Sequence, residues 1–374
     1  MEPFEDAAGG GHEQVVLCHD PESGLRAIIA IHSTVLGPAL GGVRQWAYAS
    51  AEEAVADARR LAQAMSYKAA VAGLAQGGGK AVVIGAPGSG GERQFRALGR
   101  FIDGLDGRYV AAEDVGTSPR EMQWLNRETP WVTGIPVEQG GSGDPSPLTA
   151  IGVLEGMRAA CGEVFGTPDL AGRTAVVQGC GHVGAPLVRL LLAEGMRVEC
   201  ADIDAGRATA LEREGATAVP LEGLLQRPCD ILAPCALGDA ITAEVVPLLA
   251  CRVICGAANN QLARPEVAGM LAAREILWAP DYVVNAGGIV NIYEEFTGYD
   301  PVRAEREVRR IGDTTRLVLE RARSEGTTPA AAADAIAEER IEAGRRPDGS
   351  LFGARRRREE GHPVAGLARR GVRA

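Results

Sequence analysis

The sequence predicts an α/β protein built from two domains. Its 374 residues are enough for about two domains at roughly 100 to 200 residues each. Short apolar segments of strand type alternate with helical patterns along most of the chain, which is typical of strands and helices packed in layers. A segment rich in glycine and proline, GGSGDPSP at residues 140–147, interrupts this alternation and predicts the boundary between the domains.

The first half opens with two strand-like segments, at residues 14–19 and 26–35, on either side of the turn-forming residues DPESG. Ser50 and Glu53 have the spacing of a capping box, and the small and apolar residues that follow keep helical spacing. We expect this helix to end close to Lys68. The remaining elements are a strand that begins at Lys80, a helix at about 92–105, a strand at 108–112 and a helix at about 118–128.

The second half predicts a parallel sheet. After a helical segment that ends near Phe165, short apolar segments rich in β-branched residues alternate with helical stretches or turns, as in a buried parallel sheet. Two long helical patterns, at about 301–324 and 329–343, close the fold. The predicted strands are RTAVVQG, RVECAD, ATAV, CDILAP, RVICGA and EILWAP.

A glycine-rich turn in this half predicts a dinucleotide site. Gly179, Gly181 and Gly184 follow the strand TAVVQ and open the next helix, and the strand after that helix ends in Asp202, close to the spacing of roughly 20 residues expected for an acid that binds ribose. The glycines let backbone N–H groups approach a pyrophosphate at a helix N-terminus. Because the acid would repel a 2′-phosphate, NAD is favoured over NADP. Asp204 is an alternative to Asp202 in this role.

The same turn contains His182 and Val183, which we include among the cofactor-binding residues, although the side chain of His182 is interpreted as merely tolerated there.

The predicted fold is then an N-terminal α/β substrate domain and a Rossmann-type, doubly wound parallel-sheet NAD domain, separated by a cleft. The expected ranges are 1–140 for the first domain, on which a helix at 325–343 packs back, 145–324 for the second, and 344–374 for a basic, disordered tail.

The composition excludes several functions. A net charge of -10 argues against nucleic acid as the main partner, because phosphate contacts need a basic surface. No segment reaches the roughly 20 apolar residues that a membrane span needs, and the acidic N-terminus is unlike a signal peptide, so we expect a cytoplasmic protein. The 8 cysteines form no CxxC pair, which favours reduced, buried thiols and no metal site.

Lysine is almost absent. Of the 39 basic residues only Lys68 and Lys80 are lysines, and they lie close together in the sequence. Arginine keeps its proton in proteins, whereas the pKa of a shielded lysine can be lowered until it serves in acid–base chemistry. A chain that uses arginine for nearly every other cation has therefore kept lysine, we infer, where arginine would fail.

Several longer motifs resemble the Glu/Leu/Phe/Val amino-acid dehydrogenase family, and most closely its leucine and valine dehydrogenase branch. The resemblance extends from about residue 12 to residue 342. The motifs that carry it are GPALGGVR (37–44), MSYKAAVAGLAQGGGKAVVIG (65–85), AAEDVGTS (111–118), GSGDPSPLTAIGV (141–153), APCALG (233–238), GAANNQL (256–262) and PDYVVNAGGIVN (280–291).

The resemblance implies reversible, NAD-dependent oxidative deamination of an α-amino acid to its 2-oxo acid and ammonia, by a homo-oligomer. It implies that Lys68 pairs with the substrate carboxylate, that Lys80 activates the water that attacks the imine, and that Asp114 assists proton transfer at the nitrogen. A lysine beside a second cation in a cleft should have a pKa lowered toward neutrality, which suits a general base. On strand alternation only one of Glu113 and Asp114 faces the cleft, and the motif selects Asp114. The alternative for Asp114 is a helix N-cap.

Further residues follow from the same resemblance. Those near the substrate or the nicotinamide are the backbone around Gly41 and Gly42, Asn260 (with Asn259 as an alternative), Asn285 and Thr149. Cys235 and Ala236 are included among the cofactor-binding residues. The side-chain pocket is expected to contain Leu40, Ala112, Ile289 and Ile292. All four are aliphatic, so the carboxylate of glutamate would lack a cationic partner there, and leucine, isoleucine or valine is favoured.

Three alternatives stay open. Tyr293 and Phe296 depart from the branched-chain pattern and are compatible with an aromatic substrate. A hydroxy-acid dehydrogenase would share the nucleotide domain but needs a histidine base beside an arginine, and none of the 5 histidines suits this. A non-catalytic NAD-binding regulator would have no physical need for the two lysines and Asp114.

Overall fold

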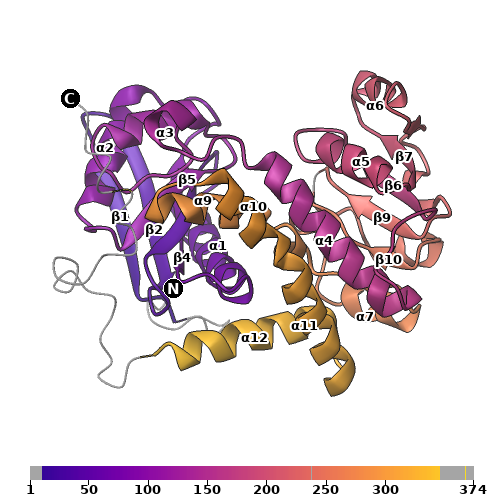
Figure 1. Cartoon of the computed structure of the whole chain (residues 1–374). Coiled ribbons are helices and arrows are strands. Elements are labelled where there is room, and N and C mark those ends of the chain that lie inside the picture. Colours follow the sequence, from indigo (N-terminus) through magenta and orange to yellow (C-terminus); the bar gives the residue numbers. More distant parts are fainter. Residues whose placement is uncertain (1–10, 237, 346–366, 368–374) are drawn as a thin grey trace. The chain divides into compact units, whose positions relative to one another are not determined.

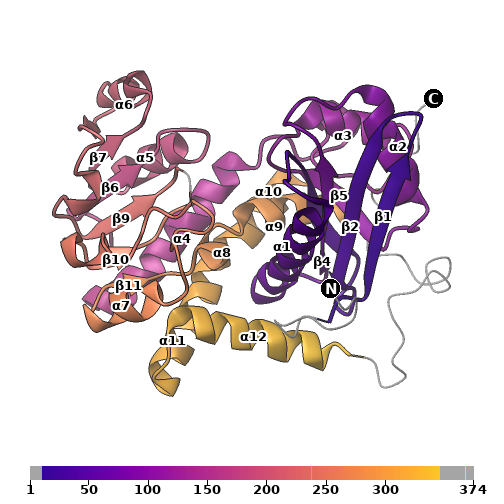
Figure 2. The same ribbon diagram turned by 180° about the vertical axis from the view of Figure 1, so that it is seen from behind.

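The computed structural model describes residues 11–236, 238–345 and 367, which fall into two compact units (Figures 1 and 2). Unit 1 contains the described residues up to Gly143, the segment Ile292–Pro301 and the residues from Ala337 onward. Unit 2 contains Asp144–Asn291 and Val302–Ile336. Of the predicted tail at 344–374, all but residues 344, 345 and 367 lie outside the described residues.

Unit 1 is built on a five-stranded sheet in the order β1-β2-β4-β3-β5. β1 and β2 are antiparallel, as are β2 and β4, whereas β3 runs parallel to both β4 and β5. Apolar residues on one face of the sheet pack against α1, and those on the other face pack against α2 and α3 (Figure 2). The elements are β1 (Gln14–Asp20), β2 (Leu25–Ser33), β3 (Ala39–Trp46), α1 (Ala51–Val71), β4 (Gly77–Ile84), α2 (Glu92–Asp103), β5 (Tyr109–Glu113) and α3 (Pro119–Asn126).

Helix α1 confirms the helix that was predicted from the capping box. The hydroxyl of Ser50 accepts a hydrogen bond from the backbone N–H of Glu53 at 3.1 Å, while the Glu53 carboxylate accepts one from the N–H of Ala49 at 2.7 Å. Alanines at helical spacing face the sheet, so the helix can lie close to it. Lys68 lies in the last turn of this helix.

Strand β4 begins earlier than predicted, because the three glycines before Lys80 belong to the strand and not to a turn. A β-carbon on Gly77 would stand 1.8 Å from the carbonyl oxygen of Ser33, and one on Gly78 would stand 2.0 Å from the backbone nitrogen of Ser66. The strand therefore lies against a neighbouring strand and against α1 with no room for a side chain, a use of glycine that is common where backbones approach closely.

Unit 2 contains the predicted parallel sheet, in the order β11-β10-β9-β6-β7-β8 with every pairing parallel. α4, α5 and α6 contribute to the core on one face and α7 to the core on the other, so the sheet is doubly wound. The elements are α4 (Ser146–Phe165), β6 (Thr174–Gln178), α5 (Gly184–Ala193), β7 (Arg197–Ala201), α6 (Ala205–Glu212), β8 (Thr217–Ala218), β9 (Ile231–Pro234), β10 (Val253–Ile254), α7 (Val267–Ala273) and β11 (Leu277–Trp278).

The order of the strands reverses between β6 and β9. From β6 the chain proceeds through β7 to β8 on one side, and then returns to place β9 on the opposite side of β6. In sheets of this kind, ligands bind beyond the carboxyl ends of the strands at such a point of reversal. The turns that follow β6 and β9 are therefore the expected place for a nucleotide.

Residues 281–343 are mainly helical. The predicted helix at 301–324 is divided at Arg310 into α10 (Pro301–Arg309) and α11 (Ile311–Glu325), and α12 (Pro329–Ala343) agrees with the second prediction. From α12, the guanidinium of Arg340 donates to the carbonyl oxygens of Ala70 (2.7 Å), Gly73 (2.6 Å) and Leu74 (3.2 Å) at the end of α1. The other helical segments are α8 (Asp281–Val284), α9 (Gly287–Tyr293), η1 (Val137–Gln139), η2 (Leu224–Gln226), η3 (Val246–Leu248) and η4 (Glu294–Thr297).

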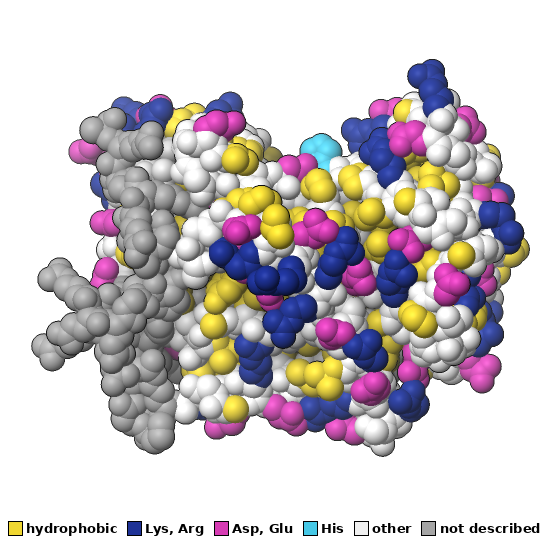
Figure 3. Space-filling model, viewed as in Figure 1, with side chains coloured by type: hydrophobic (Ala, Val, Ile, Leu, Met, Phe, Trp, Pro, Cys, Tyr) yellow, Lys and Arg dark blue, Asp and Glu magenta, His cyan; other side chains and the backbone are white. Residues whose placement is uncertain are grey.

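Charges of both signs are mixed on the surface of α10 and α11 (Figure 3). Arg309 pairs with Glu155 at 2.8 Å and with Glu305 at 2.7 Å, and Arg310 pairs with Glu307 at 3.0 Å. Exposed pairs of this kind contribute little to stability. In the described part of the chain, no helix combines the length and the apolar character needed to cross a membrane.

Candidate active site

Lys80 and Asp114 form an ion pair in unit 1. Lys80 lies within β4 and Asp114 directly follows β5, and the Lys80 Nζ is 2.7 Å from the Asp114 Oδ2. Only 5% of Lys80 is exposed, whereas the neighbouring Glu113 is an exposed residue. Sequence reasoning singled out these two side chains separately, and the fold brings them into contact.

Backbone geometry fixes the orientation of Asp114. Its N–H donates to the hydroxyl of Thr117 at 3.0 Å, and that hydroxyl donates in turn to the carbonyl oxygen of Val43 at 2.8 Å. A β-carbon on Gly42 would stand 2.6 Å from the β-carbon of Asp114, so the carboxylate occupies space that only glycine leaves free. The N-cap of α3 is Ser118, which forms a capping box with Glu121. The alternative interpretation of Asp114 as that cap is therefore wrong.

The surroundings of Lys80 and Asp114 shift the pKa of each side chain. Burial lowers the pKa of the Lys80 ammonium, and this outweighs the attraction of Asp114, while the charge of Arg44 lowers it further. Burial alone would raise the pKa of the Asp114 carboxyl, but the charges of Lys80 and Arg44 outweigh that effect and hold the pKa below its ordinary value. Asp114 is thus a carboxylate near neutral pH, and Lys80 loses its proton more readily than a lysine in water.

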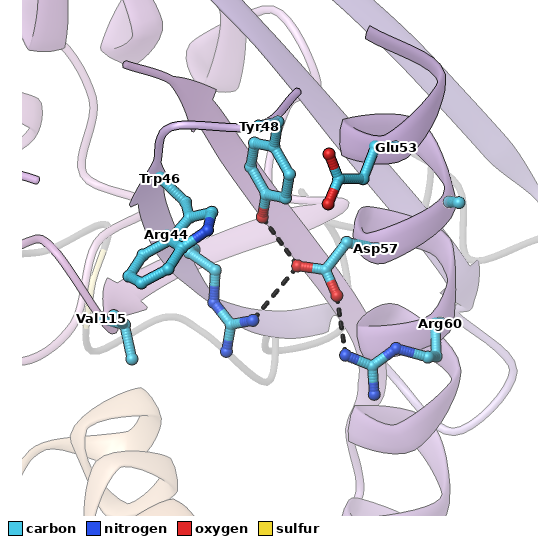
Figure 4. Close-up of a pocket in the computed structure, with 8 residues that line it drawn as sticks. Arg44, Trp46, Tyr48, Glu53, Asp57, Arg60 and Val115 are labelled. Carbon is cyan, nitrogen blue, oxygen red and sulfur yellow. Dashed lines mark hydrogen bonds and ion pairs between the residues drawn. The ribbon is translucent and has the colours of Figure 1, made fainter. Parts of the chain in front are cut away.

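Arg44 and Asp57 extend the pair, and sequence reasoning missed both. Arg44 Nε donates to Asp114 Oδ2 at 2.9 Å, and Arg44 Nη1 donates to Asp57 Oδ2 at 3.1 Å. Tyr48 Oη donates to the same Asp57 oxygen at 2.7 Å, and Arg60 Nη2 donates to Asp57 Oδ1 at 2.7 Å (Figure 4). The usable signal was the position of Arg44 two residues after Gly42 on one strand, which places both on the same face.

These side chains border a pocket of about 520 Å³. Trp46 and Val115, each about half exposed, supply its apolar surface at the carboxyl ends of β3 and β5. The pocket is lined by Arg44, Trp46, Tyr48, Glu53, Ala56, Asp57, Arg60 and Val115 (Figure 4).

Strand register places Leu40, Gly42 and Ala112 on the sheet face that bears Asp114. Gly42 is paired with Ala112 across β3 and β5, and Leu40 lies two residues before Gly42 on the same strand. Gly41 points to the opposite face, where its carbonyl oxygen accepts a hydrogen bond from Tyr109 at 2.6 Å. Lys68 is half-buried in the last turn of α1.

The glycine-rich turn of unit 2 follows β6, as predicted. Gly179 has φ +96°, and a β-carbon there would stand 2.9 Å from the backbone nitrogen of Ala236. A β-carbon on Gly184 would stand 1.9 Å from the carbonyl oxygen of Gly179. At Gly181 the nearest atom to such a β-carbon, on Arg207, is 3.8 Å away, so the turn is open at this point. His182 is exposed, and Val183 is the residue before α5.

The turn after β9 packs against this glycine-rich turn. The N–H of Cys235 donates to the carbonyl oxygen of Gln178 at 2.7 Å, at the point where the strand order reverses. Burial raises the pKa of the Cys235 thiol to about 12, so the thiol stays protonated. Ala236 is exposed beside Gly179. Both turns therefore border the expected nucleotide position.

Asp202 and Asp204 differ in their contacts. Asp202 Oδ2 accepts from the N–H of Cys180 at 2.7 Å, and its Oδ1 accepts from the N–H of Asp204 at 2.9 Å, so the carboxylate lies beside the glycine-rich turn. Asp204 is the N-cap of α6 and accepts from the N–H of Gly206 at 3.0 Å. The capping bond gives Asp204 a structural role of its own.

The remaining candidates in unit 2 are Asn285, Asn260 and Thr149. Asn285 Nδ2 donates to the side-chain oxygen of Asn259 at 2.7 Å, while the adjacent Asn260 is exposed and has φ +53°. A β-carbon on Gly288 would stand 3.2 Å from the hydroxyl of Thr149, so the NAGG segment lies on the start of α4.

The predicted specificity residues are divided between the units. Ile289 is buried in unit 2, whereas Ile292 is half-buried and opens the 292–301 segment of unit 1. Phe296 is fully buried and packs against Tyr293, with ring centroids 5.3 Å apart. Phe296 therefore belongs to the core.

Known proteins are similar to this chain over most of its length. A family model described as "Glu/Leu/Phe/Val dehydrogenase, dimerisation domain" matches residues 12–131, and one described as "Glutamate/Leucine/Phenylalanine/Valine dehydrogenase" matches residues 201–343. A valine dehydrogenase from Streptomyces albus is 52% identical over 89% of this chain and 93% of its own length. A leucine dehydrogenase from Thermoactinomyces intermedius is 49% identical over 91% and 94%.

Solved structures show the same fold. The crystal structure of L-tryptophan dehydrogenase from Nostoc punctiforme has a TM-score of 0.82 and 40% identity, and covers 89% of this chain and 96% of that one. The hetero-hexameric glutamate dehydrogenase from Thermus thermophilus has a TM-score of 0.75 and 25% identity, with 91% of each chain covered.

Proposed function

The chain belongs to the Glu/Leu/Phe/Val dehydrogenase family, and from this premise we propose that it catalyses the reversible, NAD-dependent oxidative deamination of a branched-chain L-amino acid. The products are the 2-oxo acid, ammonia and NADH. The observation that carries the proposal is the ion pair, at 2.7 Å, between the buried Lys80 and the partly buried Asp114.

The proposed roles of Lys80 and Asp114 follow from the pKa shift of each side chain. Lys80, with its lowered pKa, takes a proton from the water that attacks the imine. Asp114, which is ionised before the reaction, takes up a proton from the substrate nitrogen and later returns it. Lys68 acts as the fixed cation for the substrate carboxylate. The chemistry that NAD would supply when bound is acceptance of the hydride from the α-carbon of the amino acid.

The residues of unit 2 fit a dinucleotide. The glycine-rich turn stands at the reversal of strand order and packs on the turn at Cys235, and Gly181 leaves open space above the backbone. Asp202 lies beside that turn and is the acid that we assign to the adenosine ribose, which favours NAD over NADP. His182, Val183, Thr149, Asn285 and Ala236 complete the proposed cofactor site.

The aliphatic residues Leu40, Ala112, Ile289 and Ile292 favour the side chain of leucine, isoleucine or valine, since an acidic substrate would meet no cation among them. Gly41, Gly42 and Asn260 are assigned to the same substrate. An aromatic substrate is the second candidate, because the L-tryptophan dehydrogenase resembles this chain over 96% of its own length. Tyr293 and Phe296, which depart from the branched-chain pattern, support the same candidate.

We propose a homo-oligomer as the working form. β1 is an edge strand of its sheet, and its Val15 and Leu17 are 39% and 71% exposed. An apolar edge strand is a natural site for pairing with another chain. The matching family model for residues 12–131 is described as a dimerisation domain.

The proposal is tested by NADH formation with a panel of L-leucine, L-isoleucine, L-valine, L-phenylalanine, L-tryptophan and L-glutamate at alkaline pH. We expect kcat/KM to be highest for a branched-chain substrate and higher with NAD than with NADP. A maximum with an aromatic amino acid would support the second candidate. NAD binding without turnover of any amino acid would contradict both and favour a regulatory protein.

A further inference from the structure

We propose that Arg44, held in place by Asp57, is a positioning residue that fixes the Asp114 carboxylate against Lys80 and serves as its permanent counter-charge whenever Lys80 is neutral. This inference rests on the proposed function. In this role the charge of Arg44 acts on the general base, Lys80, through the carboxylate of Asp114.

The first support is that one carboxylate oxygen serves two cations. Asp114 Oδ2 is 2.7 Å from Lys80 Nζ and 2.9 Å from Arg44 Nε. Both cations therefore orient the same oxygen. When Lys80 gives up its proton, the carboxylate keeps Arg44 as a partner, so the buried charge is not left uncompensated.

The second support is the way in which Arg44 is held. Its Nη1 donates to Asp57 Oδ2 at 3.1 Å, which leaves the planar guanidinium between two carboxylates. Asp57 is itself fixed by Tyr48 at one oxygen and by Arg60 at the other, both at 2.7 Å (Figure 4). The side chains of Arg44, Asp57 and Asp114 are 22%, 17% and 22% exposed, so solvent screens these charges only partly.

Strand geometry explains why an arginine reaches both acids. Arg44 is paired with Val82 across β3 and β4, and Val82 and Lys80 share a face of β4. That face is covered by α1, which carries Asp57. A lysine at position 44 would keep the charge but lose the fixed fork that binds two carboxylates at once.

The effect on Lys80 has a definite sign. Asp114 and Asp57 raise the pKa of the ammonium, whereas Arg44 lowers it, in addition to the larger lowering by burial. The other titratable groups that face the network are Tyr48, Glu53 and Arg60, and burial raises the pKa of Tyr48, so its hydroxyl stays neutral. Loss of Arg44 should raise the pKa of Lys80, and loss of the Asp57 charge should lower it.

The experiment compares pH profiles of kcat/KM for oxidative deamination in the full-length protein. The rising limb reports the deprotonation of the essential base in the free enzyme. The amino group of the substrate titrates equally in every variant, so differences between profiles belong to the protein. For Arg44→Gln we expect the rising limb to move to higher pH by about one unit. On that limb kcat/KM should be about tenfold lower than in the wild type, and at higher pH it should recover.

Two further variants separate charge from shape. Arg44→Lys keeps a cation and should move the limb by less than half as much as Arg44→Gln. Asp57→Asn keeps an oxygen that accepts from Arg44 but loses the charge, so its limb should move to lower pH. If Arg44→Gln fails to fold, the pH profile of Asp57→Asn tests the role of Arg44 in its place. Arg96→Gln, which removes an exposed arginine paired with Glu128 in the same unit, is the matched control and should keep the wild-type profile.

Three results would overturn the role of Arg44: an unshifted limb in Arg44→Gln, an equal loss at every pH, or equal shifts in Arg44→Gln and Arg44→Lys. An upward or absent shift in Asp57→Asn would do the same. These results differ from a failure of the proposed function, in which the wild-type protein itself would turn over no amino acid.

Discussion

The ammonium of Lys80 and the carboxylate of Asp114 are in direct contact at 2.7 Å, although their strands are separated in the sheet by β3. The contact crosses over Gly42 of that middle strand, where a β-carbon would collide with Asp114. The pair therefore depends on a glycine in the strand between its two members.

Replacement of Lys80 tests its role as the base. Lys80→Ala should lower kcat by at least about 10²-fold, the lower end of what a positioned acid or base contributes, because it removes the proposed base. Binding of NADH, measured by its fluorescence, should be unchanged. Lys80→Arg should be equally inactive, since arginine keeps its proton. Normal turnover in Lys80→Arg would show that proton transfer is not the function of this residue.

Replacement of Lys68 should act chiefly on substrate binding. We expect Lys68→Ala to raise the KM for the amino acid by about tenfold or more, since a charge-assisted contact is worth roughly 1.5–3 kcal/mol, with a smaller change in kcat. Steady-state kinetics with L-leucine measures both constants. A fall in kcat with unchanged KM would place Lys68 in the chemistry and not in the binding of the carboxylate.

Asp202 is expected to set the preference between the two dinucleotides. Asp202→Ala removes the charge that repels a 2′-phosphate, and the ratio of kcat/KM for NAD to that for NADP should fall. Asp204→Ala serves as the matched variant, because Asp204 caps α6 and should affect stability more than this ratio. An unchanged ratio in Asp202→Ala together with a lower one in Asp204→Ala would assign the role to Asp204.

The close approach of β3 to β4 predicts a large effect on stability at Gly41. A β-carbon there would stand 1.7 Å from the carbonyl oxygen of Gly79, a backbone atom that cannot move aside alone. Gly41→Ala should lower the free energy of unfolding by about 3 kcal/mol or more. Gly162→Ala, inside α4 with no atom within 4 Å, is the control and should raise it by up to about 1 kcal/mol. Urea titration compares the two, and an unaffected Gly41→Ala would contradict the packing.

Regular patterns made unit 2 predictable. Each of its strands is a short apolar segment between turn or helix signals, so period and composition were sufficient. β3 was missed because ALGGVRQW contains two adjacent glycines and has no clear alternation. The start of β4 was misplaced for a related reason, since three glycines in succession are typical of a turn. In both strands the glycines are set by contacts with other strands, which a local pattern does not contain.

The candidate site was predictable where a residue type was rare. Lysine occurs only at two positions, so Lys80 attracted attention, and the motif that contains Asp114 supplied its partner. Arg44 and Asp57 belong to residue types that are abundant in this chain, and nothing local marks them. Their role depends on the pairing of β3 with β4 and on the packing of α1, which appear only in three dimensions.

The hydrogen bonds of Arg340 join α12 to the end of α1, two segments that are far apart in the sequence. Of its three acceptors, Ala70 shares the last turn of α1 with Lys68, and Gly73 and Leu74 follow that turn. A protein shortened before residue 340 would leave these carbonyl groups to water and let that turn fray. Removal of a few residues from the end of α12 would thus reach the proposed carboxylate anchor from about 270 positions away in the chain.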